Sequence, residues 1–185
     1  MGTEKMTDLK KKKTGKRGPD RAKFTDEIEK LLADPNIQKM ARFGQHRGNN
    51  TLDHVVSVAW VSFDMAEELG WEIDEKSLAR GAILHDYYLY DIKQMGISDY
   101  EHGVGHPGRA LKNARTLFNL SRKEENIILS HMWPLTLFHP PRSKEAILVT
   151  LADKYCAGNE MVLHRNRLGK RGREAKKLKQ HDETA

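Results

Sequence analysis

The spacing of apolar residues along this chain predicts a helical protein. Apolar positions recur three and four residues apart in one segment after another, as with Ile28, Leu31 and Leu32. Six such segments are expected to be helical, namely residues 24–34, 51–70, 74–91, 105–120, 121–134 and 143–165. Residues 36–50 are expected to form a short helix that closes into a Gly/Asn loop. No segment alternates apolar and polar residues for long enough to favour a strand. The expected fold class is therefore all-α, a compact bundle of helices joined by short loops.

Local signals mark where these helices begin and end. The expected N-caps are Thr25, Thr51, Asp74 and Ser121, the last with Glu124 in a capping box. Pro107 is expected in the first helical turn of its segment. Pro35 follows the end of the first helix, and Gly70 and Pro134 are expected to end two others.

Charge divides the chain into three parts. Residues 1–23 carry a net charge of +6 and residues 165–185 carry +5, which leaves −5 for residues 24–164 within the total of +6. We therefore expect a basic, disordered arm over 1–23, a helical core over 24–164 and a basic tail over 165–185. The two basic segments are either solvated or in weak, sequence-independent contact with nucleic acid. They lack the interleaved aromatic residues that stack on bases.

Composition also narrows the class of protein. No apolar run approaches the ~20 residues of a membrane span, so no membrane association is expected. The single cysteine, Cys156, excludes an internal disulfide and is compatible with a cytoplasmic location.

Several strongly polar residues interrupt apolar stretches or stand at helix ends. They are His54, His85, Asp86, His106, His131 and Asp153. An ionised carboxylate in an apolar helix, such as that of Asp153, costs several kcal/mol unless it is paired or bound to a metal. Lys154 points about 100° away around the helix, which leaves an arginine from another helix or a metal ion as the partner.

Taken together, these six side chains form a set of nitrogen and oxygen ligands. Imidazole and carboxylate without thiolate suit Fe, Mn, Zn, Ni or Co rather than a structural zinc site. Six ligands exceed the need of one ion with open positions. Two ions sharing one carboxylate, as in two-metal hydrolases, would use them all.

The order of these residues resembles a known family. His54, the doublet His85-Asp86 and Asp153 match the H…HD…D pattern of the HD-domain metal-dependent phosphohydrolases, over about residues 46–165. The spacing is similar to that of small bacterial HD enzymes, including symmetrical diadenosine tetraphosphate hydrolases. It is also similar to bacterial HD proteins that contain "HGxxHP" and "HMWPL", which here begin at His102 and His131.

The resemblance implies two divalent transition-metal ions, with Fe or Mn favoured and Zn, Ni or Co as alternatives. The ligands it implies are His54, His85, Asp86 and Asp153 for one ion, and His106 and His131 with a bridging Asp86 for the other. The implied reaction is hydrolysis of a phosphoester or phosphoanhydride in a nucleotide or another small phosphorylated substrate, through a metal-activated water. The alternative is a non-catalytic, metal-stabilised HD module for sensing or interaction.

Other residues are candidates for contact with the substrate. His46, Arg47 and Arg109 could bind phosphate groups, and His102 could protonate the leaving group. Trp133 and the tyrosines after the doublet could stack on a base or pack in the core.

The residues after the doublet depart from one branch of the family. Many members, including the cyclic di-GMP phosphodiesterases, place a short residue, glycine and lysine there, whereas this chain has Tyr87, Tyr88, Leu89 and Tyr90. This departure argues against cyclic di-GMP as the substrate and leaves the general acid without a firm assignment. The oligomeric state is left open.

Overall fold

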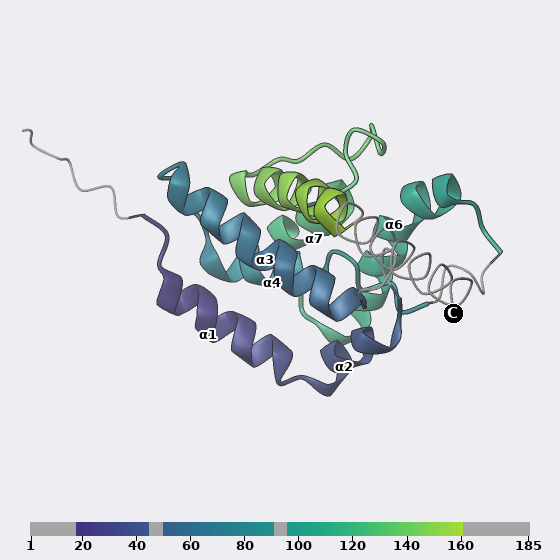
Figure 1. Ribbon diagram of the computed structural model, residues 1–185, viewed down its shortest axis with the longest axis horizontal. Coiled ribbons are helices and arrows are strands. Elements are labelled where there is room, and N and C mark those ends of the chain that lie inside the picture. Colours follow the sequence, from purple (N-terminus) through teal and green to yellow (C-terminus); the bar gives the residue numbers. More distant parts are fainter. Residues whose placement is uncertain (1–17, 45–49, 91–95, 161–185) are drawn as a thin grey trace, which may run out of the picture.

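The computed structural model describes residues 18–44, 50–90 and 96–160, and these fold into a bundle of helices (Figure 1). The elements are α1 (Arg21–Leu32), α2 (Pro35–Gln38), the 3₁₀ helix η1 (Lys39–Arg42), α3 (Thr51–Glu68), α4 (Glu75–Leu84), α6 (Asp99–Leu117) and α7 (Arg122–Ser130). Residues 144–160 form a further helix. Within these ranges there is no strand, only an isolated bridge between Gly44 and Asn50. The predicted all-α fold class is confirmed.

Helix α4 lies at the centre of the bundle. It packs against α1, α3, α6 and α7, and its Leu78, Ala82 and Leu84 are fully buried. Gly81 permits the close crossing with α7, because a Cβ atom there would lie 2.5 Å from Ile127 Cδ1. The segment that follows α4 therefore starts in the middle of the molecule.

Helix starts were predicted well where the capping signal was unambiguous. Asp74 caps α4 by accepting a hydrogen bond from Ser77 N, and Ser121 and Glu124 form the capping box of α7. Gly70 follows the end of α3 with a φ of 61°, as a glycine after a helix C-cap often does.

The predicted caps Thr25 and Thr51 were wrong. Asp20 caps α1, and the Thr25 hydroxyl instead donates to Arg21 O inside the helix. Asn50 caps α3, one residue before Thr51. In both places an Asp or Asn upstream of the threonine satisfies the first-turn amide groups, and these residues rank above threonine as N-caps.

The start of α6 was also predicted wrongly. Pro107 does not lie in the first turn, because a capping box between Ser98 and Glu101 starts the helix at Asp99. Ser98 and Glu101 have the three-residue spacing of a capping box, which is a stronger start signal than the proline. Gly103 is helical and buried, and a Cβ there would lie 3.0 Å from Leu135 Cδ2, so the missing side chain makes room for the segment after α7.

Much of the predicted basic arm and all of the predicted tail lie outside the described residues. Helix α1 takes in Arg21 and Lys23, which the charge pattern had assigned to the arm. None of the helices in the described part of the chain has both the length and the apolar character that a membrane crossing requires.

Candidate metal centre

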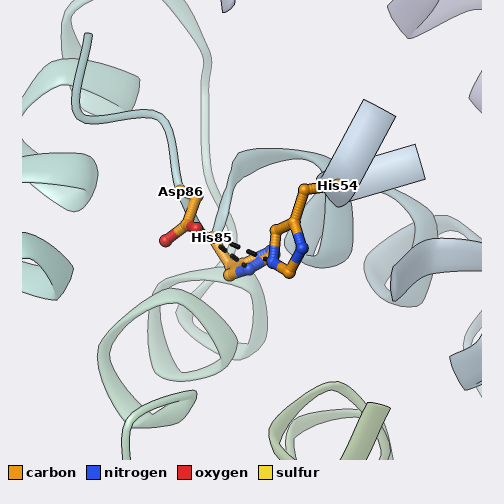
Figure 2. Close-up of side chains that lie close together, drawn as sticks. All are labelled: His54, His85 and Asp86. Carbon is orange, nitrogen blue, oxygen red and sulfur yellow. Dashed lines mark ion pairs between the residues drawn. The ribbon is translucent and has the colours of Figure 1, made fainter. Parts of the chain in front are cut away.

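Five separate elements bring the six polar residues of the sequence pattern together. His54 lies in the first turns of α3, His85 and Asp86 follow α4, and Asp153 lies on the helix over residues 144–160. The other two come from α6 and the end of α7, as His106 and His131. All six are buried. Figure 2 shows His54 reaching from α3 toward the doublet.

Asp86 lies between two groups of histidines. Its Oδ2 is 3.9 Å from His54 Nε2 and 3.6 Å from His85 Nε2. Its Oδ1 is 3.2 Å from His106 Nε2 and 3.5 Å from His131 Nε2. One carboxylate oxygen therefore faces each pair of histidines. The cluster thus contains two triads that share Asp86: His54, His85 and Asp86, and Asp86, His106 and His131. Within each triad the potential ligand atoms lie within 4.8 Å of one another.

Asp153 belongs to the side of the cluster that holds His54. Its Oδ1 lies 3.1 Å from His54 Nε2 and 3.6 Å from His85 Nε2. The carboxylate that the sequence singled out inside an apolar helix thus faces two imidazoles. Its neighbour Lys154 points elsewhere, donating to the backbone carbonyls of His131 and Thr150.

Backbone carbonyls orient three of the histidines. The Nδ1 atoms of His85, His106 and His131 lie 2.7, 2.9 and 2.8 Å from the carbonyl oxygens of residues 82, 102 and 128. Because a carbonyl only accepts hydrogen bonds, each Nδ1 carries a proton. A ring held in this way turns Nε2 toward Asp86, and the neutral form presents the Nε2 lone pair there, as a metal ligand does.

The resulting geometry favours a bound cation. The Nε2 atoms of His106 and His131 are 2.6 Å apart, so their two lone pairs repel unless a proton is shared between them or the rings separate slightly to bind one cation together. His85 Nε2 is fully buried without a hydrogen-bond partner among the described residues. A nitrogen and oxygen donor set with such a buried acceptor fits a divalent transition metal.

Burial and neighbouring charges shift the pKa values of the histidines and of Asp86 in different directions. Burial opposes protonation of His54, but hydrogen bonds to Asp153 and Glu160 outweigh it and raise its pKa to about 10. Burial tends to raise the pKa of Asp86, yet the neighbouring His85 and His106 hold it well below its usual range. Burial and then His106 and His85 lower the pKa of His131 to about 3, so this ring is a neutral potential ligand.

Sequence reasoning missed Glu160. Its Oε1 accepts a hydrogen bond from His54 Nδ1 at 3.1 Å, and its side chain is 10% exposed. It follows Asp153 by seven residues, which returns it to the same face of the helix after two turns. That spacing was the available signal. A carboxylate behind a histidine fixes the ring and raises its basicity, a common arrangement in metal sites.

The substrate candidates lie in different places. His102 is next to the cluster. Its ring stacks on the His106 ring with 4.5 Å between the ring centroids, and its Nδ1 lies 2.8 Å from the Tyr90 hydroxyl oxygen. Arg109 donates to the same hydroxyl at 3.2 Å. Trp133 instead lines a separate apolar pocket. His46 and Arg47 lie outside the described residues.

The comparison with protein families was decisive. Residues 51–158 match the model of the HD domain, which covers more than half of the chain. The chain belongs to the HD domain family. The resemblance drawn from the H…HD…D pattern is thereby confirmed, and all six residues of the cluster fall within the match.

Membership of the HD family carries a general expectation about chemistry. HD domains form a superfamily of metal-dependent phosphohydrolases, and the buried His/Asp clusters of this chain could hold metal ions. No curated protein and no solved structure matches the chain.

Proposed function

We propose that this HD protein is a binuclear, metal-dependent phosphohydrolase that cleaves a phosphoester or phosphoanhydride in a nucleotide or another small phosphorylated substrate. The observation that carries the proposal is the position of Asp86, with one oxygen toward each pair of histidines. A carboxylate shared in this way suits two ions held side by side. The charge and ligand type favour Fe or Mn, with Zn, Ni and Co as alternatives.

The residues would divide between two metal positions. His54, His85 and Asp153 would hold one ion with Oδ2 of Asp86, and His106 and His131 would hold the other with Oδ1. When bound, the ions would acidify an attacking water and neutralise charge on the phosphoryl oxygens. Asp86 would fix the separation of the two positions. Glu160 would keep the Nε2 of His54 turned toward them.

Tyr90 links the two substrate candidates beside the centre. Arg109 is exposed and donates to the Tyr90 hydroxyl, which can in turn donate to His102 Nδ1. In this arrangement the proton of the His102 ring is on Nε2, where it could be donated to a phosphate oxygen or to a leaving group. The Arg109 guanidinium is suited to a second phosphate. We therefore propose His102 as the proton donor and Arg109 as a phosphate contact.

The remaining assignments follow from chemistry rather than from geometry. We propose a small phosphorylated molecule as the partner of the core and a cytoplasmic location. We further propose that His46 and Arg47 contact phosphate and that Trp133 contacts the base. The basic segments at both ends would make at most weak contact with nucleic acid.

The test is hydrolysis by the purified full chain after addition of Mn or Fe. We expect phosphate release from at least one of a set of nucleotides, dinucleoside polyphosphates and cyclic dinucleotides. Asp86→Ala should reduce release to background, whereas Asp26→Ala, on the exposed side of α1, should leave it unchanged. Metal binding without turnover of any of these substrates would favour the non-catalytic HD module instead.

A further inference from the structure

A pocket that is separate from the metal centre and from the one lined by Trp133 lies beside the first turns of α7. Its volume is about 450 Å³, which is within the range of small-molecule sites. The lining includes Arg122 and Asn126 on α7 and Phe138, His139 and Arg142 in the segment that follows it. None of the six residues of the cluster lines it.

The pocket lining has more basic than acidic side chains, with Arg122, Lys123 and Arg142 against Glu125. Glu125, on the pocket wall, is held by Arg115 through an ion pair of 2.7 Å. Lys123 is likewise engaged with carboxylates outside the pocket. In the described part of the chain, the guanidinium groups of Arg122 and Arg142 form no ion pair, and both side chains are exposed. Two arginines at one concave site are suited to a phosphate group.

The same pocket has an aromatic rim and a fixed wall. Phe138 is 91% exposed at its edge, and Leu129 forms an apolar part of the lining. The Asn126 amide donates to Pro140 O and its oxygen accepts from Arg142 N, so one side chain holds the segment that carries both Phe138 and Arg142. An exposed phenyl ring beside two arginines offers a stacking surface next to an anion site.

We propose that this pocket is a second ligand site, which binds a nucleoside monophosphate. Arg122 and Arg142 would bind the phosphate, and Phe138 would stack on the base. The site is connected to the metal centre by structure, because α7 runs from Arg122 to the residue before His131, and residues 131–143 join His131 to the pocket. A nucleotide bound there would restrain α7 and residues 131–143 relative to each other.

The test is calorimetric binding of the non-hydrolysable phosphonate analogue of AMP to the full chain carrying Asp86→Ala, which removes the ligand shared by the two triads. We expect the analogue to bind, with Arg122→Gln and Arg142→Gln each weakening it about tenfold or more. Lys112→Gln removes one positive charge from the exposed face of α6 and should change the affinity less than about twofold. If the arginine variants bind as tightly as the parent, the proposal is wrong.

The ligand class is tested with the same proteins. Phe138→Ala should weaken binding of the analogue and leave the affinity for inorganic phosphate unchanged, because only the base would contact the phenyl ring of Phe138. Inorganic phosphate that binds as tightly as the analogue would overturn the assignment of a nucleotide. A second measurement uses metal-loaded proteins in which Asp86 is intact. There the Arg122→Gln/Arg142→Gln double variant should bind one equivalent less of the analogue than the wild type. An unchanged stoichiometry would also contradict the proposal.

Discussion

At the scale of single residues, the site depends on how imidazole and carboxylate groups are held from behind. Three histidines are fixed through Nδ1 by backbone carbonyls, and His54 is fixed by the Glu160 carboxylate. A backbone carbonyl cannot be removed by substituting the side chain of its residue. The Glu160 carboxylate can be removed by substitution, so the orientation of a ligand can be tested directly at Glu160.

Glu160→Gln should weaken metal binding by about 10- to 100-fold, because the neutral amide no longer supports the basicity of His54. Isothermal titration with Mn would measure this loss. Asn159→Ala, at the exposed neighbouring position, should bind Mn as the wild type does. The pKa of His54 followed by NMR in the metal-free protein should also fall in Glu160→Gln. If the affinity changes less than about twofold, Glu160 does not position the ligand.

The raised pKa of His54 gives the metal-free protein a distinctive dependence on pH. The folded pKa of about 10 lies above the unfolded value of 6.5, so the stabilising contribution of protonated His54 is fully present below pH 6.5. It is lost as the pH rises through 10. With a chelator present, the thermal midpoint should fall more steeply between pH 7 and 10 in the wild type than in His54→Gln. Parallel curves for the two proteins would contradict this assignment.

The six residues of the cluster could be found from the sequence because each polar group stood out against apolar neighbours or in a family pattern. Asp153 was evident since a carboxylate inside an apolar helix needs a partner. Glu160 gave no such contrast, because it follows Gly158 and Asn159 near a polar end of the helix. Its seven-residue spacing from Asp153 indicates the same helix face, but whether the helix continues that far, past Gly158, depends on packing.

At the scale of elements, α4 positions the doublet by crossing α7 closely. The crossing depends on Gly81, whose missing side chain leaves room for Ile127. The sequence predicted both helices through the caps Asp74 and Ser121, but it could not predict their distance. The start of α6 was placed too late because Pro107 was assigned to the first turn, although Ser98 and Glu101 have the spacing of a capping box.

Gly81→Ala should destabilise the fold by about 1–3 kcal/mol, because the added methyl group overlaps Ile127. Gly108→Ala is the matched control, since it is also a helical glycine but has no atom within 4 Å of the added Cβ. That change should stabilise the protein by about 0.5–1 kcal/mol through helix propensity. Chemical denaturation would compare the two variants. Similar free energies of unfolding would show that the α4–α7 crossing is not tight at Gly81.

At the scale of the whole molecule, the candidate metal centre joins elements that are distant in sequence. Its residues come from α3, from the end of α4, from α6, from the end of α7 and from the helix over residues 144–160. A ligand that binds only the folded chain stabilises it by mass action, so metal ions at this position would stabilise the bundle as a unit. The number of ions depends on whether Asp86 is shared.

Counting metal ions per chain tests that sharing most directly. Elemental analysis of protein loaded with Mn or Fe and freed of excess metal should give about two ions per chain, as expected for a two-metal site. His131→Ala should retain about one ion, because only the triad with His106 is broken. Asp86→Ala should lose both, because each triad uses one of its oxygens. A wild-type chain that holds one ion or fewer, or an Asp86→Ala chain that holds as many as His131→Ala, would contradict the shared carboxylate.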